Sequence, residues 1–178
     1  MSIVLAGSTS GSVTLQEPAV AGTTVLDLPA ASGTVMVSGN QPAFAVTNSG
    51  NQSVTSSVFT KVALQTELFD TANAFDSTTN YRFQPTVAGY YQFNATLLLI
   101  GTSITQTWTT FFKNGSNFIG SYQRWASLND VCSNTSALVY LNGSTDYIEL
   151  YTFIVAVSPS VFGSSTGVQF SGALVRAA

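Results

Sequence analysis

The stretch NYRFQPTVAGYYQFNATLLL, residues 80–99, decides the fold of this 178-residue chain. Arg82 is its single charged residue, and aromatic and aliphatic side chains fill much of the remainder. From Tyr90 onward the apolar residues recur at every second position, which is the period of a β-strand. We predict that one face of this strand is core and the other is mixed. The residues predicted to face the core are Tyr91, Phe93, Ala95, Leu97 and Leu99.

The rest of the chain has the same character. Signals for helices are nearly absent, and β-branched and aromatic residues alternate with short runs of Gly, Asn, Ser and Pro. This pattern predicts an all-β sandwich or barrel. Asn114-Gly115 predicts a tight hairpin turn, because both residues tolerate a positive φ angle. A second turn is predicted at residues 141–144.

A second strand, YIELYTFIVAV at residues 147–157, is apolar on both faces. A two-layer sandwich buries one face of each sheet. We therefore expect the second face to require a partner, and an oligomer would supply one. The first face carries Ile148, Leu150, Ile154 and Ala156, and the opposite face carries Tyr147, Tyr151, Phe153, Val155 and Val157.

Charge is scarce along the chain. Charged residues make up 7% of the sequence and the net charge is −3, whereas an ordinary domain has about 25% charged residues. No cluster of Lys and Arg is present, so nucleic acid and anionic membranes are poor partners. The composition suits either a neutral, polar β-protein or a subunit largely covered by copies of itself, and we favour the second interpretation.

The sequence also argues against an enzyme. It contains no histidine, which excludes Ser–His and Cys–His dyads. Glu67, Asp70 and Asp76 lie close together and could form an acid pair or a calcium site, but their spacing matches no EF-hand loop and Asp is common in turns. We predict no catalytic residue, no metal and no cofactor. Cys132 is the single cysteine, and we expect it to be a small buried residue.

Two further absences bear on the partners of the chain. The first residues carry no basic segment before their short apolar run, so no secretory signal is predicted. The longest apolar run is far too short to span a bilayer. We predict no membrane partner.

The first 40 residues differ from the others. They contain no aromatic residue and two charged ones, and short strands are predicted at 3–6, 12–16, 24–28 and 34–37. Such a segment cannot build a large core, so we predict an extended anchoring arm at 1–40 and a separate domain at 41–178. The arm would bind another surface through strand edges and small apolar contacts. Its candidate anchoring residues are Ile3, Val4, Leu5, Val13, Leu15, Val25, Leu26 and Leu28.

Several separated motifs in residues 42–175 follow a family pattern. Its positions here are Ala43-Phe44, Tyr81, Phe83, Gly89, Tyr91, Phe93, Lys113–Gly115, Leu141, Gly143, Asp146, Ile148, Leu150, Phe170-Ser171-Gly172 and Leu174. In this order and spacing the segment resembles the globular head of complement component one-q, a jelly roll shared with tumour necrosis factor. This sequence departs from the family pattern at Pro85, which lies one turn position earlier than the family's proline-glycine pair, with Ala88 before Gly89. The resemblance implies a jelly-roll knob that forms a homotrimer with an apolar centre, with Tyr147, Tyr151, Phe153 and Val155 as candidate interface residues.

The arm also has a resemblance. Its Val/Thr/Ala/Pro-rich stretch GSVTLQEPAVAGTTVLDLPAASGTV is similar to segments of tailed-phage tail fibres and capsid decoration proteins. This implies a structural virion protein: a trimeric decoration, or cement, protein on the outer surface of a phage capsid. It would be made in the host cytoplasm, and the arm would bind the major capsid protein.

Two alternatives remain at this stage. The chain could be a tail-fibre or receptor-binding tip that recognises host glycans, or a soluble bacterial carbohydrate-binding module. Both would use aromatic rings to stack on sugars, although such rings more often fill a core or an interface. The candidate stacking residues are Trp108, Tyr122 and Trp125.

Overall fold

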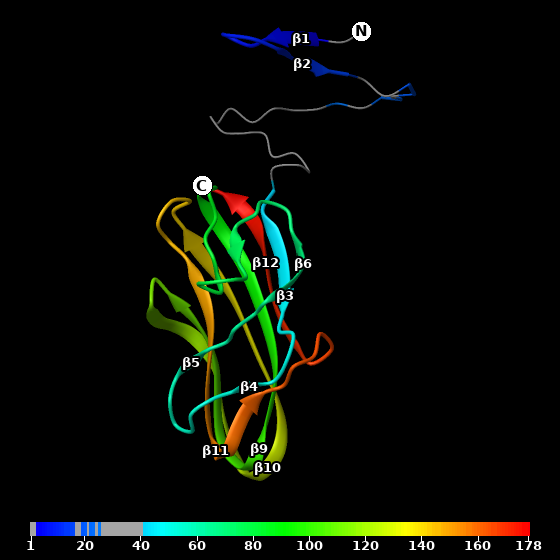
Figure 1. Cartoon of the computed structure of the whole chain (residues 1–178). Helices are drawn as coiled ribbons and strands as arrows, with labels where there is room; N and C mark the ends of the chain where they lie inside the picture. Colours follow the sequence, from blue (N-terminus) through cyan, green and yellow to red (C-terminus); the bar gives the residue numbers. More distant parts are fainter. Residues whose placement is uncertain (1–2, 17–18, 21, 24, 26–40) are drawn as a thin grey trace. The chain divides into compact units, whose positions relative to one another are not determined.

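The computed structural model describes residues 3–16, 19–20, 22–23, 25 and 41–178 (Figure 1). The chain separates into two units between Val35 and Met36, and each is described by itself. The predicted boundary after residue 40 stays a prediction. Among the described residues, none forms a helix that is long and apolar enough to cross a membrane.

The first unit contains a β-hairpin. Strands β1 (Ile3–Ala6) and β2 (Ser12–Leu15) pair antiparallel. The turn closes with a hydrogen bond from the Gly7 amide to the Gly11 carbonyl, 2.9 Å long, and Gly11 has the positive φ of 78° that glycine allows. Both strands agree with the sequence-based prediction. The predicted strands at 24–28 and 34–37 lie outside the fully described part of the chain.

The second unit is an all-β, two-layer jelly roll, as the sequence predicted. The ten strands of its continuous sheet are β3 (Ala43–Thr47), β4 (Gln52–Ser53), β5 (Thr60–Lys61), β6 (Thr66–Asp70), β7 (Phe75–Asp76), β8 (Arg82–Phe83), β9 (Gly89–Lys113), β10 (Ser116–Leu141), β11 (Ile148–Val161) and β12 (Val168–Ala177). The strand order is β6-β3-β12-β9-β11-β8-β7, with β10 beside β9 and with β4 and β5 beside β11.

Two very long strands join the layers. β9 and β10 form one hairpin through the predicted Asn114-Gly115 turn, where both residues have positive φ. The first part of β9 pairs with β12 in layer one, and the part after Leu99 pairs with β11 in layer two. β9 and its neighbour β11 bend between the layers, where the register shifts and Ser103 of β9 and Ser158 of β11 adopt positive φ.

The core lies between the two layers and is rich in phenylalanine. Phe44 is fully buried, and its ring stacks on Phe83 at 4.4 Å and meets Phe170 edge-on at 5.0 Å. Gly172 lies beneath these rings: a Cβ atom there would come within 2.8 Å of Phe44 and 2.6 Å of Phe93. In the Phe170-Ser171-Gly172 motif, Phe170 therefore contributes a core ring, and Gly172, which has no side chain, leaves room for the rings of Phe44 and Phe93.

The alternation predicted for residues 91–99 is confirmed. The odd-numbered side chains are all buried, and the even-numbered ones are partly or fully exposed. Burial raises the pKa of Tyr91 to about 12, and its hydroxyl donates a hydrogen bond to the Val87 carbonyl. The expectation for Cys132 was wrong: its side chain is exposed, because it falls on the outward-facing positions of β10.

Candidate functional site: two outer faces of the jelly roll

An aromatic row crosses the outer face of layer two. Phe153 on β11 and Tyr122 on β10 both lie opposite Trp108 on β9, and residues opposite each other in a sheet point to the same side. The rings of Trp108 and Tyr122 are 4.9 Å apart. Arg124 donates a hydrogen bond to the Tyr122 hydroxyl, which places a cation beside the row.

A loop of the same chain partly covers this row. The centroid of the Phe59 ring lies 5.1 Å from that of Phe153, 5.6 Å from Trp108 and 5.7 Å from Phe112. The Ser57 amide, which has a positive φ, donates to the Ile154 carbonyl and ties this loop to the edge of β11. We name the set of Phe59, Trp108, Phe112, Tyr122, Tyr151 and Phe153 the aromatic cluster.

An ion pair between the partly exposed Lys61 and the buried Glu149 borders the aromatic cluster. Tyr151 stacks on Phe112 with centroids 3.9 Å apart, and burial raises the pKa of Tyr151. Lys61 Nζ lies 6.0 Å from the Tyr151 ring centroid and 2.5 Å from Glu149 Oε1. Glu149 is buried although it lies on the outer side of β11, so this side of the sheet already has a small core of its own.

The structure places the four predicted interface residues on this one face. Tyr151 and Phe153 belong to the aromatic cluster, and Val155 follows on the same strand, opposite Gln106. Tyr147 lies just before β11, with the Arg82 guanidinium 4.4 Å from its ring centroid. All four side chains are half-buried in the single subunit. Part of the cover that the sequence predicted from a second chain comes from the subunit itself, because Phe59 packs on Phe153 and Phe112 stacks on Tyr151.

The three candidate stacking residues are not brought together. Trp108 and Tyr122 are neighbours, but Trp125 packs against the interior cluster from the opposite side of β10. The Trp125 indole lies 3.4 Å from the Thr107 hydroxyl in a hydrogen bond. A sugar platform of this face would therefore consist of Trp108 and Tyr122, with Arg124 as its polar neighbour.

Layer one carries a second outer face that the sequence argument missed. Its side chains come from the ends of β9, β10 and β12 and from β6. The large exposed residues are Phe69 (51% exposed), Tyr90 (43%), Leu138 (57%), Tyr140 (41%) and Val175 (62%), and we name them the open face. Alternation in SALVYL, residues 136–141, could have revealed Leu138 and Tyr140, but neighbouring polar residues weakened the signal.

A shallow pocket lies beside the open face. It has a volume of about 210 Å³ and a mostly apolar lining that includes Phe69, Ala173 and the stems of Gln92 and Asn94. Next to it, Tyr90 and Tyr140 pack with ring centroids 5.4 Å apart. Such a pocket has room for one protruding side chain of another molecule.

The long strand β10 is also an edge. It pairs with β9 along its length, and no other described strand pairs with it. An exposed edge this long is a risk for uncontrolled pairing unless something covers it. Leu138 and Tyr140 project from this edge strand, so the edge and the open face adjoin.

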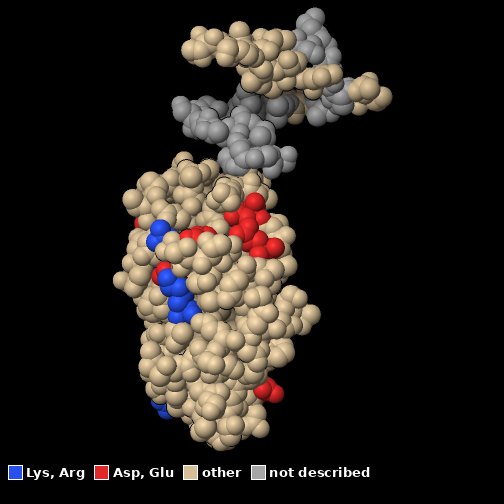
Figure 2. Space-filling view, in the orientation of Figure 1, with Lys and Arg blue, Asp and Glu red and all other residues tan. Residues whose placement is uncertain are grey.

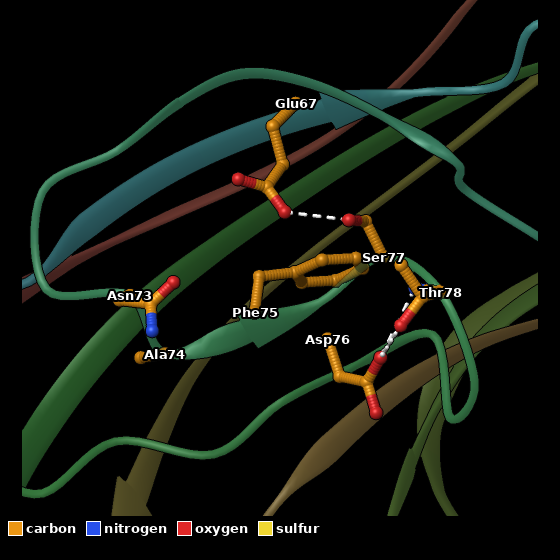
Figure 3. A pocket seen from close by; sticks show the side chains of 7 residues that line it. All are labelled: Glu67, Asn73, Ala74, Phe75, Asp76, Ser77 and Thr78. Atoms are coloured by element: carbon orange, nitrogen blue, oxygen red, sulfur yellow. Dashed lines mark hydrogen bonds between the residues drawn. The ribbon is translucent and has the colours of Figure 1, made fainter.

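The three carboxylates that could have formed a cation site accept hydrogen bonds from residues 72–80 instead, and Figure 3 shows two of them, Glu67 and Asp76. Glu67 accepts a hydrogen bond from the Ser77 hydroxyl, and Asp70 accepts one from the Phe75 amide. Asp76 accepts hydrogen bonds from the Thr79 and Thr78 amides, which hold its pKa well below the usual value. Glu67 and Asp76 border a pocket of about 350 Å³, and no group of three His, Cys, Asp or Glu residues in the described part could hold a metal ion.

The described arm residues are all exposed. Ile3, Val4 and Leu5 lie on β1, Val13 and Leu15 lie on β2, and Val25 follows outside any strand. Leu26 and Leu28 lie outside the described residues. The hairpin therefore presents its candidate anchoring side chains to solvent in the single subunit.

The architecture is that of a jelly-roll domain, and its fold is similar to that of complement one-q and tumour necrosis factor domains. Solved structures with this fold include the globular domain of zebrafish complement 1qA protein (TM-score 0.58, 15% identity, covering 78% of this chain and 99% of that one). Eiger TNF from S. frugiperda (TM-score 0.61, 10% identity, 78% and 95%) and murine APRIL at pH 8.5 (0.58, 11%, 76% and 99%) share it as well. At these identities the likeness concerns the fold. No family model and no curated protein matches the chain.

Proposed function

We propose that this chain is a non-enzymatic structural subunit that assembles as a homotrimer and decorates the capsid of a tailed phage. The observation that carries the trimer is that the described jelly roll exposes two different surfaces, the β10 edge with Leu138 and Tyr140 and the part of the open face around Phe69 and its pocket. The phage context is supported by the likeness of the arm to segments of tailed-phage structural proteins.

A threefold ring requires two different surfaces. In a head-to-tail contact, one patch of each subunit meets a second patch of the next, and the ring closes when the rotation is 120°. The β10 edge with Leu138 and Tyr140 is one patch, and the region around Phe69 and its pocket is the other. One contact would then cover both the long edge and the exposed apolar side chains.

We assign the interface to the open face and not to the aromatic cluster, because of exposure. Complete burial of a large apolar side chain contributes about 1.5–3 kcal/mol. Leu138 and Val175 still expose more than half of their surface, whereas Tyr151 and Phe153 are already half-buried. An interface at the open face therefore gains more per residue.

Low charge favours a decoration role over a free soluble role. The face drawn in Figure 2 has most of its charged side chains in the upper part of the jelly roll, and the lower half is uncharged apart from one acidic and one basic patch at its edges. A surface of this kind suits a protein held at high density beside copies of itself. A rigid trimer also presents three arms at once, so each arm that binds the major capsid protein raises the effective concentration of the other two.

One observation favours a second candidate function. If the open face forms the trimer, the row of Trp108 and Tyr122 with Arg124 stays on the outside of the assembly. Aromatic rings with a nearby hydrogen-bond donor can stack on a sugar. The knob would then be a tail-fibre or receptor-binding tip that contacts a host glycan.

Three measurements test these proposals. Sedimentation of the purified chain should give a trimer at micromolar concentration, and a stable monomer would refute the assembly.

Deletion of residues 1–40 should abolish capsid binding but leave a folded trimer. Full decoration by the truncated protein would refute anchoring by the arm. Imaging of the virion separates the two roles: decoration predicts about one trimer at each threefold site, and a fibre tip predicts a few per particle.

A further inference from the structure

The β1–β2 hairpin has one fully aliphatic face. Ile3 lies opposite Leu15 and Leu5 lies opposite Val13, and opposite residues in an antiparallel pair point to the same side. The four side chains are 55–62% exposed. The other side carries Val4, Ala6, Ser12 and Thr14, which are mostly small or polar. The hairpin is thus two-sided, with four of its five large apolar side chains on one side and Val4 on the other.

This face needs a cover. An isolated two-stranded hairpin is at best marginally stable in water, because it has no second layer to bury its apolar side. No charged residue lies between positions 3 and 16 to keep the face or the strand edges apart from other chains. The aliphatic face is therefore a binding surface and not a solvated one.

We propose that the cover is the same hairpin of the other two subunits, so that three aliphatic faces pack together around one axis. This inference rests on the trimer proposed above. The uncharged hairpin favours its own copies, since identical hairpins approach without electrostatic repulsion and nothing on them would attract a partner of opposite charge.

Tethering makes the neighbouring copies the first partners available. Leu15 and Ala43 are 28 positions apart in the sequence. A fully extended chain of this length spans about 90 Å, so a hairpin stays within that distance of its own jelly roll. Three hairpins confined to a sphere of that radius are each present at roughly 0.5 mM to one another. A separate partner must reach a similar concentration to compete.

A bundle of three hairpins would present a different side of each hairpin to the capsid protein. With the aliphatic faces turned inward, the outward side of the three-hairpin bundle carries Val4, Ala6, Ser12 and Thr14. The anchor would then be one preassembled element per trimer in place of three independent arms.

Hydrogen exchange on the purified full-length protein tests this without any capsid present. We expect the amides of residues 3–6 and 12–15 to exchange at least tenfold more slowly than an unstructured chain. Leu5→Asp should remove this protection. Val4→Asp is the matched control, because it places the same charge one residue away on the other side of the hairpin, and it should keep the protection.

Cross-linking identifies the cover. In a Cys132→Ser background, which removes the exposed native thiol, Leu5→Cys subunits should be linked to one another by a short bis-maleimide, and Val4→Cys subunits should be linked far less. Protection without cross-linking between Leu5→Cys subunits would overturn the proposal, because the cover would then be the subunit's own chain.

Failure of the hairpin bundle and failure of the trimer are distinguishable. A trimer in the ultracentrifuge whose hairpin amides exchange at the unstructured rate, or become protected only when capsids are added, refutes the bundle alone. Equal loss of protection in both aspartate variants also refutes it. A monomer in the ultracentrifuge refutes the trimer on which the bundle rests.

Discussion

A charge at Leu138 is expected to break the trimer without unfolding the subunit. The side chain is 57% exposed in the single subunit, so covering the remainder contributes about 1–1.5 kcal/mol in the assembly. Leu138→Asp loses this contribution and also places an unpaired carboxylate in the contact, which costs about 2 kcal/mol more. A total of about 3 kcal/mol weakens each contact by more than 100-fold.

Sedimentation velocity across a concentration series measures the effect, and thermal denaturation followed by circular dichroism checks the fold. Val157→Asp is the matched control, because Val157 is similarly exposed, at 63%, but lies on β11 in layer two. We expect the control to remain a trimer. A Leu138→Asp protein that sediments as a trimer with unchanged affinity would show that the interface does not use the open face.

Three further predictions concern the stability of the knob. Gly172→Ala should destabilise it by about 1–3 kcal/mol, because the new methyl group overlaps two core rings; chemical denaturation measures this. Lys61→Met should cost about 2 kcal/mol, since it leaves the buried carboxylate of Glu149 without its ion-pair partner, and Glu149→Gln added to that variant should restore most of the loss. Asp76→Asn should cost about 1 kcal/mol at neutral pH by weakening the hydrogen bonds of its loop. Because the pKa of Asp76 is lowered by folding, its contribution is complete above about pH 4 and is lost as the pH falls below that value; a pH series of melting temperatures for both proteins should converge in acid, and a constant difference would contradict the assignment.

The features read correctly from the sequence are local ones. The alternation in residues 91–99, the Asn114-Gly115 turn and the β1–β2 strands all depend on neighbours within a few positions, where the period of two and the tolerance for positive φ act directly. The match of Phe170-Ser171-Gly172 to a family pattern also indicated the jelly-roll fold. The close packing of two rings over Gly172 is visible only in the tertiary structure.

The errors share a cause. Trp125 was grouped with Trp108 and Tyr122, but it points to the interior. The expectation that Cys132 is buried failed because its neighbours Val131 and Ser133, and not Cys132 itself, face inward on β10. Composition alone does not indicate which side of a 26-residue strand faces the core, particularly where bulges shift the register between residues 124 and 130.

By itself, the sequence determined that this chain folds as β-strands around a phenylalanine-rich core and that more apolar surface exists than one sandwich interior can hold. Only the tertiary structure decided where that surplus lies. Phe59, which is 49 residues from Trp108 in the sequence, folds over the aromatic row, whereas Leu138 remains 57% exposed and Tyr140, beside Tyr90, remains 41% exposed. The physical reason is that alternation records which side chains share a face, while the cover of that face comes from segments distant in sequence, whose position depends on the packing of the whole domain.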